Sequence, residues 1–181
     1  MSSFFPISEL NLILTGYLGP DQLSLGQQVA AKLHLPFVDL EQELANRASL
    51  SVADIRSYYG ETRLKSLETE IVHDSALRRG TVIRIGGRML AHGDNYERLR
   101  ATGPVICLTI ELGAMLQRLH VSMGARYHNP DNRTLALGEL QRQWDARTLE
   151  GIHNIDTYER TQEEIIDLVC ELWRELAIRR G

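Results

Sequence analysis

A glycine-containing segment follows the first buried apolar run and suggests the most definite chemistry in the sequence. It extends from Gly16 through Gly19 to Gly26 and lies where a helix should begin. Loops of this kind bind phosphate because backbone N–H groups and a helix N-terminus face the anion. In the pattern G-x-x-x-x-G-K-[ST], a Lys reaches the outer phosphates and a Ser or Thr hydroxyl holds Mg²⁺. The segment is therefore a candidate phosphate-binding loop.

Three diagnostic positions of this loop depart from the pattern. Counted from Gly16, Asp21 stands at the second Gly, Gln22 at the Lys and Leu23 at the hydroxyl residue. Asp21 brings negative charge to the place where phosphates bind. We interpret Gln22 as a neutral placeholder, with an amide contact to phosphate as the alternative. The sequence thus predicts a weakened or closed phosphate site.

Ser24 and Asp39 are the residues that would hold Mg²⁺ if it binds, and no metal site is predicted otherwise. Ser24 comes one position after the expected hydroxyl residue. A Ser at this place is more typical of a helix N-cap. Neither ATP nor Mg²⁺ is therefore predicted as a cofactor, unless the protein is an active kinase.

Arg84 interrupts the apolar run of residues 81–85. A charge buried in a strand is costly unless it is paired. Arg84 could reach into the vacated phosphate space as a replacement cation, assisted by Arg88. Alternatively, it forms a structural ion pair with Asp39, Asp21 or Glu41. Both interpretations require an anion beside Arg84.

Short apolar runs alternate with longer helical patterns, which is typical of an α/β protein. Parallel strands need a crossover long enough to hold a helix, and their ligands bind beyond the carboxyl ends of the strands. We therefore predict one domain over residues 1–181, with a five-stranded parallel sheet and helices on both faces. The predicted strands are residues 11–15, 36–39, 81–85, 105–110 and 151–156.

Capping boxes and turn residues mark the helix boundaries. Ser51 with Asp54 and Thr161 with Glu164 each predict a helix start. Gly60 should end the first of these helices, and a longer one should run over residues 62–79. Residues 122–133 are rich in Gly, Asn, Asp and Pro, so we expect an exposed, mobile loop that forms a lid.

Composition excludes several classes of protein. The chain has 181 residues, 20 Lys and Arg against 24 Asp and Glu, and a net charge of −4, which does not favour nucleic acid as a partner. No apolar run approaches the roughly 20 residues that cross a bilayer. The two cysteines do not form a disulfide or metal pattern. We expect a cytoplasmic protein without a membrane or nucleic-acid partner.

The motifs, taken in order, resemble the shikimate kinases, which are P-loop enzymes similar to nucleoside monophosphate kinases. The resemblance covers residues 11–176. It rests on the segments 11–26, 35–41, 51–55, 60–68, 82–87 and 155–157. This resemblance implies the P-loop kinase fold and transfer of the terminal phosphoryl group of ATP to a hydroxyl of shikimate.

The resemblance also implies a set of substrate-binding residues. Glu41 stands where the family has an Asp that binds substrate hydroxyls, and Lys65 stands where it has an Arg that grips the substrate carboxylate. Lys supplies charge without the planar, bidentate fork of Arg. Of the family's three glycines, Gly86 and Gly87 are retained and the third is Arg88.

Three further residues match functional positions of the family. Asp39 matches the acidic residue near the magnesium, and Arg126 matches the lid Arg that closes over ATP, so these two are the implied catalytic residues. Arg147 matches the second substrate-binding Arg, although Arg142 competes with it for this role.

The sequence supports three hypotheses about function. In the first, the chain has lost or weakened its ATP-dependent kinase activity and binds a small acid or polyol. In the second, it is an active kinase of shikimate or a related hydroxy acid, in which Arg84 or Arg88 replaces the loop Lys. In the third, it acts through a protein partner or as a homo-oligomer.

Overall fold

The computed structural model describes residues 7–16 and 22–180. At its centre lies a five-stranded parallel sheet with the strand order β2-β3-β1-β4-β5. This confirms the predicted sheet. The strands are β1 (Leu12–Gly16), β2 (Phe37–Asp39), β3 (Val82–Arg84), β4 (Val105–Thr109) and β5 (His153–Asp156).

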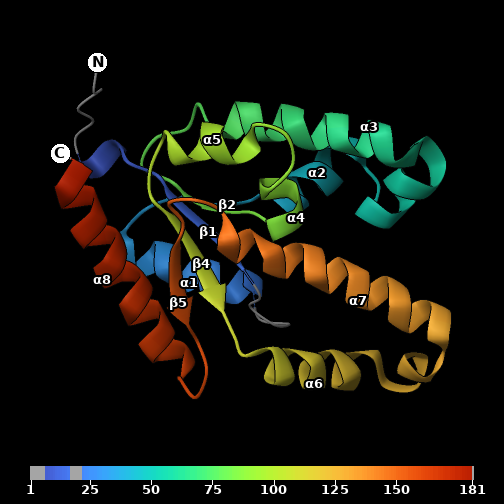
Figure 1. Ribbon diagram of the computed structural model, residues 1–181. Helices are drawn as coiled ribbons and strands as arrows, with labels where there is room; N and C mark the ends of the chain where they lie inside the picture. Colours follow the sequence, from blue (N-terminus) through green and yellow to red (C-terminus); the bar gives the residue numbers. More distant parts are fainter. Residues whose placement is uncertain (1–6, 17–21, 181) are drawn as a thin grey trace.

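Helices cover both faces of the sheet, as predicted (Figure 1). Helices α1 and α8 pack on one face, and α2, α3 and α5 pack on the other. The helices are α1 (Gln22–Leu33), α2 (Leu40–Ala48), α3 (Val52–Ser75), α4 (Gly87–Leu90), α5 (Asn95–Arg100), α6 (Leu112–Met123), α7 (Pro130–Asp145) and α8 (Gln162–Arg180). Short 3₁₀ turns are η1 (Ile7–Glu9), η3 (Gly124–His128) and η4 (Ala146–Thr148).

The core lies in two layers because the central strands β1 and β4 are buried on both faces. In β1, Leu12 and Leu14 pack towards α1 and α8, while Ile13 packs towards α3 and α5. All three side chains are fully buried. This explains why the central strands β1 and β4 are mainly apolar, as is usual for parallel sheets with helices on both sides.

Local signals fix the helix starts. Ser51 Oγ accepts a hydrogen bond from the Asp54 N–H at the start of α3. At α8, Glu164 N–H donates to Thr161 Oγ1 and Thr161 N–H donates to Glu164 Oε2, which is a full capping box. Gly60 interrupts α3 with non-helical angles (φ 82°, ψ 168°). The two predicted helices therefore meet at Gly60 in one kinked element.

Residues 122–133 are helical for most of their length, so the prediction of a loop there was wrong. They include the end of α6, the η3 turn and the first turn of α7. Asn129 Oδ1 accepts hydrogen bonds from the N–H groups of Asp131 and Asn132, and Pro130 occupies the first turn. These polar residues form a helix N-cap, where Pro costs little. A role for the segment as a lid remains a prediction.

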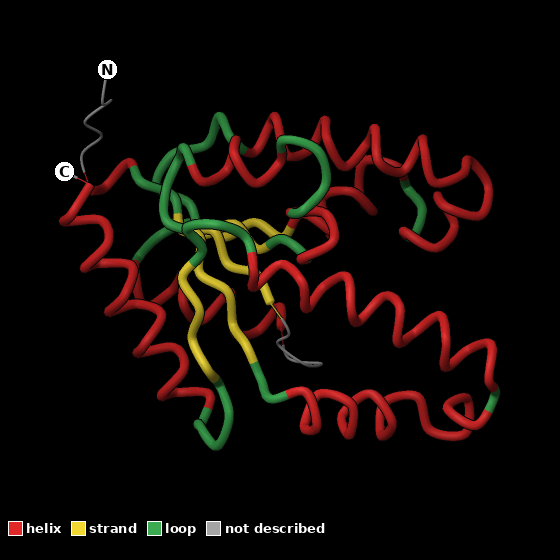
Figure 2. Tube along the Cα trace, in the orientation of Figure 1, coloured by secondary structure: helices red, strands yellow, loops and turns green. Residues whose placement is uncertain are grey.

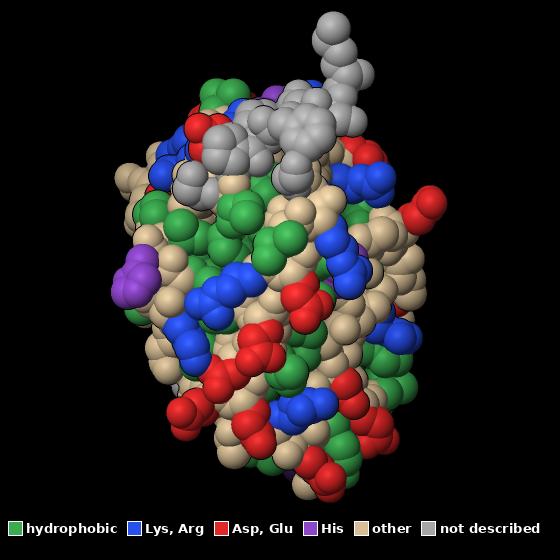
Figure 3. Space-filling model, turned by 90° about the vertical axis from the view of Figure 1, so that its left-hand side faces the viewer, with side chains coloured by type: hydrophobic (Ala, Val, Ile, Leu, Met, Phe, Trp, Pro, Cys, Tyr) green, Lys and Arg blue, Asp and Glu red, His purple; other side chains and the backbone are tan. Residues whose placement is uncertain are grey.

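Helices α6 and α7 form a hairpin that extends from the carboxyl ends of the strands (Figure 2). A small core of Ile110, Met115 and Leu140 lies at its base. On the face of the molecule seen in Figure 3, both acidic and basic side chains are exposed.

Candidate functional site

The candidate site begins at the carboxyl ends of β2 and β3. Asp39 and Arg84 are the last residues of these strands and face each other in the sheet register. Arg84 Nη1 lies 2.6 Å from Asp39 Oδ2 and 3.5 Å from Glu41 Oε2. The side chains of Arg84 and Asp39 are only 9% and 7% exposed. The ion pair that the sequence analysis considered is therefore present.

Asp39 has a second structural task. Its Oδ1 atom accepts a hydrogen bond from the Gln42 N–H at 2.9 Å and so caps α2. A carboxylate at a helix N-terminus is stabilised by the helix dipole. Both oxygens of Asp39 are thus in use within the protein.

Gly86 and Gly87 follow β3 and allow close packing at the start of α4. A Cβ atom on Gly86 would lie 2.6 Å from Glu41 Oε1. One on Gly87 would collide with the Gln143 carbonyl oxygen and lie 2.9 Å from the Ala146 Cβ. The two glycines therefore bring the chain against Glu41 and α7.

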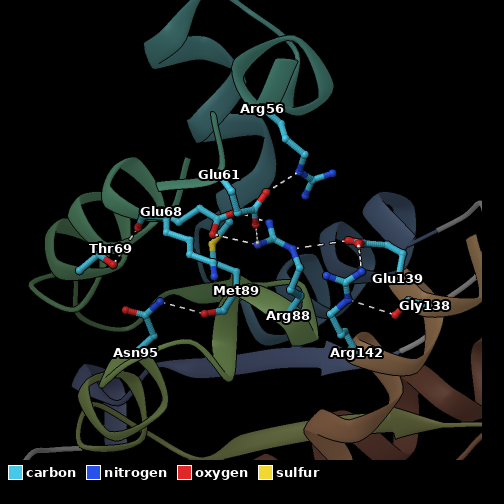
Figure 4. A network of polar contacts seen from close by, with 11 residues as sticks. Arg56, Glu61, Glu68, Thr69, Arg88, Met89, Asn95, Gly138, Glu139 and Arg142 are labelled. Carbon is cyan, nitrogen blue, oxygen red and sulfur yellow. Dashed lines mark hydrogen bonds and ion pairs between the residues drawn. The ribbon is translucent and has the colours of Figure 1, made fainter. Parts of the chain in front are cut away.

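Arg88 connects α3, α4 and α7 through carboxylates (Figure 4). Its Nη2 atom pairs with Glu68 Oε1, and its Nη1 atom donates to Glu68 Oε2 at 3.3 Å. Arg88 Nη1 lies 3.6 Å from Glu61 Oε1, and Nε lies 3.5 Å from Glu139 Oε1. The guanidinium is only 14% exposed and Glu68 is fully buried. This arrangement is a charge network built around one arginine.

Burial and pairing act in opposite directions on the ionisation of this network. Burial raises the pKa of Glu68, although the hydrogen bond and charge of Arg88 partly oppose it. For Arg88, burial lowers the pKa, but the hydrogen bond and charge of Glu68 outweigh it and leave a raised value. Burial also raises the pKa of Glu61, but the hydrogen bond and charge of Arg56 outweigh it and leave a lowered value.

Three cavities surround this network. The inner cavity has a volume of about 180 Å³ and is lined by Glu41, Val52, Glu68, Gly86, Arg88, Met89, Glu139 and Gln143. The Lys65 recess, of about 300 Å³, is lined by Glu61, Lys65, Arg88, Ala91, His92, Arg142 and Asp145. The outer groove, of about 790 Å³, lies between α3 and the α6–α7 hairpin and includes Arg56, Arg126 and Arg142.

The predicted cationic residues lie in different places. Lys65 lines the recess, and Arg126 of η3 is exposed in the outer groove. Arg142 lines both of these spaces and donates from Nε to the Gly138 carbonyl. Arg147 stacks on Trp144, with its guanidinium carbon 3.8 Å from the ring centroid. The structure therefore brings Glu41, Gly86 and Arg88 to one cavity, and Lys65 to the neighbouring one.

The glycine loop is described only at its two ends. Gly16 has φ 108°, and a Cβ there would collide with the Leu108 backbone of β4. Gly19 and Asp21 lie outside the described residues, as do the side chains of Gln22 and Leu23, which open α1. Ser24 Oγ accepts a hydrogen bond from Gln28 Nε2 at 3.0 Å.

The described residues do not fit a bound magnesium nucleotide. Asp39 is held by the positive charge of Arg84, which would repel a divalent cation at the same carboxylate. In addition, the sequence has Gln22 and Leu23 where such loops have Lys and a hydroxyl residue. We therefore derive no catalytic step through magnesium or ATP.

The sequence analysis missed the carboxylates that surround Arg88. Glu61 and Glu68 appeared there only as part of a motif, and Glu139 did not appear. The sequence held a signal for these carboxylates. Arg88 stands at a position where the resemblance implies a glycine, and the argument that a buried Arg84 needs an anion applies equally to it.

The fold is that of the P-loop kinases, and comparison with known proteins gives the family. The family model for shikimate kinase matches residues 23–173. The chain belongs to the shikimate kinase family. It is 29% identical over 170 residues to a shikimate kinase from Geobacter sulfurreducens, covering 94% of each chain. It is 25% identical over 167 residues to one from Thermodesulfovibrio yellowstonii, covering 92% of this chain and 96% of the relative.

Solved structures agree with this assignment of the fold. Shikimate kinase from Bacteroides thetaiotaomicron superposes with a TM-score of 0.75 at 24% identity, covering 91% of this chain and 98% of that one. Shikimate kinase from Acinetobacter baumannii in complex with shikimate gives 0.72 at 21% identity, covering 93% and 94%. Among the described residues, no helix has the length and apolar character needed to span a membrane.

Proposed function

We propose that this member of the shikimate kinase family binds a small polyol or hydroxy acid and has lost or weakened ATP-dependent phosphoryl transfer. The ligand would lie at the carboxyl ends of the strands, in the inner cavity beside Gly86 and Glu41. Parallel α/β sheets bind their ligands at this edge. The solved complex of the Acinetobacter relative with shikimate supports a ligand of this size and hydroxyl content.

One observation carries the loss of transfer: both arginines that could replace the loop Lys are already neutralised. Arg84 lies 2.6 Å from Asp39, and Arg88 is surrounded by Glu61, Glu68 and Glu139. Phosphoryl transfer depends mainly on positioned positive charge. Loss of a single preorganised donor costs about 3 to 4 kcal/mol in a typical case, or roughly 10² to 10³ in rate.

The alternative function is an active kinase of shikimate or a related hydroxy acid. It is favoured by the relatives of similar length, which bear the name shikimate kinase. In this alternative, Arg84 or Arg88 would have to leave its carboxylate partners when ATP binds. For Arg88 this would strand Glu68, which is fully buried, and an uncompensated buried charge costs about 3 to 5 kcal/mol.

A thermal-shift series tests the proposal. The purified chain is heated with shikimate, with neutral polyols, and with MgATP or MgADP, each alone. We expect a raised melting temperature with at least one acid or polyol and no rise with either nucleotide. Stabilisation by MgATP alone at submillimolar concentration would contradict the proposal.

A variant with a restored loop provides the positive control. Replacement of Asp21, Gln22 and Leu23 by Gly, Lys and Ser introduces the missing pattern. We expect this variant to be stabilised by MgADP where the parent chain is not. A parent chain that responds as strongly as the variant would show that the natural loop binds nucleotide without the Lys.

A further inference from the structure

We infer that Arg88 determines ligand specificity, and that it makes the inner cavity a site for a small polyol without negative charge. This inference rests on the proposed function, in which the same cavity binds a small hydroxylated ligand. It separates the two ligand classes named there, because it predicts that the cavity takes polyols and excludes hydroxy acids.

The guanidinium of Arg88 is already occupied by carboxylates of the protein. Its Nη1 and Nη2 atoms both bond to Glu68. Nη1 also lies 3.6 Å from Glu61, and Nε lies 3.5 Å from Glu139. A ligand carboxylate would have to displace one of these groups. Displacing Glu68 would leave a fully buried carboxylate without its cation, which is a large penalty.

The rest of the inner cavity presents hydrogen-bond acceptors. Among the described residues that line it, Arg88 is the only Lys or Arg, whereas Glu41, Glu68 and Glu139 carry carboxylates. Glu41 lies against Gly86, where even a Cβ atom would come within 2.6 Å of its oxygen. Hydroxyl groups can donate to these oxygens. A ligand carboxylate would instead have to compete with Glu41 for Arg84, or with Glu68 and Glu139 for Arg88, because these arginines already balance the carboxylates of the cavity.

Lys65 does not provide a cation for a ligand carboxylate inside the inner cavity. It lines the neighbouring recess, together with Arg142 and His92. Arg88 belongs to the wall of both spaces. In Figure 4 its side chain points between Glu68 on one side and Glu139 on the other. An acid that placed its hydroxyls beside Glu41 and its carboxylate beside Lys65 would therefore meet the Arg88 side chain.

A matched ligand series tests the charge preference by isothermal titration. Glucitol, glucamine and gluconate share a six-carbon polyol chain and differ at one end, which is neutral, cationic or anionic. We expect glucitol and glucamine to bind at least about tenfold more tightly than gluconate. We also expect the methyl ester of shikimate to bind more tightly than shikimate. Tighter binding of either acid than of its uncharged counterpart, or no binding by any of these ligands, would overturn the inference.

A double variant tests the role of Arg88 itself. Arg88→Gly removes the guanidinium, and Glu68→Gln in the same chain avoids leaving a buried charge unpaired. In this variant we expect the ratio of gluconate to glucitol affinity to rise about tenfold or more. Glu175→Gln, on the exposed side of α8, is the matched control and should not change the ratio.

An unchanged ratio in a double variant with the parent circular dichroism spectrum would overturn the role of Arg88. If the double variant does not fold, Glu139→Gln replaces it: we expect relatively tighter gluconate binding, and an unchanged ratio would count against the inference. The outcomes also separate the two proposals. Preference for gluconate without ADP release would refute this inference alone, whereas ATP-dependent phosphorylation of glucitol would refute the proposed loss of transfer alone.

Discussion

At the scale of single residues, Arg88 and Glu68 form the most consequential pair in the molecule. Glu68 is fully buried and Arg88 is 14% exposed, so the Glu68 carboxylate cannot turn to water if Arg88 is removed. Such a pair contributes little net stability compared with apolar residues, but breaking it is costly. The pair is therefore better explained by the structure that the site requires than by a gain in the stability of the fold.

Arg88→Ala should destabilise the fold by about 3 to 5 kcal/mol, because it leaves Glu68 buried and unpaired. Glu68→Gln should cost less, since Arg88 keeps Glu61 and Glu139 as partners. Urea unfolding followed by circular dichroism measures both values. A loss below about 1 kcal/mol for Arg88→Ala would contradict the described network.

The two cysteines provide a test of burial. Burial raises the pKa of Cys107 to about 12, against a weak opposing effect of Arg147, and burial also raises the pKa of Cys170. The thiolate is the reactive form, so neither folded thiol should react with DTNB at pH 8 within minutes. Both thiols should react in urea. Fast labelling of Cys107 in the native protein would contradict its burial.

The same shift affects stability at high pH. An ordinary thiol ionises at a pKa of about 8.5 in the unfolded chain, whereas folded Cys107 stays protonated up to about 12. The unfolded state therefore binds fewer protons between these values. The contribution of Cys107 to stability is complete below about pH 8.5 and is lost as the pH rises towards 12.

At the scale of elements, Gly60 and Gly138 should respond in opposite ways to replacement by alanine, because only Gly60 has backbone angles that alanine disfavours. Gly60 has φ 82° and ψ 168°, a conformation that is essentially restricted to glycine. Gly138 lies inside α7, and a Cβ there would meet nothing closer than the flexible Arg142 side chain at 3.6 Å.

Gly60→Ala should therefore destabilise the protein by about 1 to 3 kcal/mol through backbone strain alone. Gly138→Ala should stabilise it by about 0.5 to 1 kcal/mol, because alanine loses less entropy in a helix. Thermal melts of the two variants provide the comparison. Equal melting temperatures would mean that α3 has no kink at Gly60.

The elements also show how far sequence reasoning extends. The five strands and the two helix N-caps at Ser51 and Thr161 were predictable, because apolar runs and capping pairs are local signals. The partner of Arg84 was predictable in kind, since a charge in a buried strand requires an anion. These predictions require only the local sequence and the fold class.

Other features were not predictable from local patterns. Asn129 and Pro130 suit a loop as well as a helix N-cap, and only the packing of α7 decides between the two. The carboxylates around Arg88 come from α3 and α7, up to 51 residues away in the sequence. Their convergence depends on how these helices pack on α4. Sequence reasoning therefore predicted the ion pair of Arg84 in kind but not the carboxylates around Arg88.

At the scale of the whole molecule, the fold is that of the family, whereas the loop sequence after β1 departs from the P-loop pattern. The chain keeps the five-stranded parallel sheet and the crossover helices of the shikimate kinase family. Its loop sequence lacks the Lys and the hydroxyl residue, and Asp39, Arg84 and Arg88 are engaged with one another or with neighbouring carboxylates. This combination supports the proposed loss of transfer, because it leaves little positive charge to stabilise a phosphoryl group.

The most direct test of the proposed loss of transfer is a coupled ADP-release assay with MgATP at saturating shikimate and, separately, at saturating glucitol. An active shikimate kinase, assayed under identical conditions, defines the full signal. We predict that this chain releases ADP at least about 10²-fold more slowly than the active enzyme, as expected when a positioned cation is lost. Turnover at a rate comparable to that of the active enzyme, with either acceptor, would contradict the account.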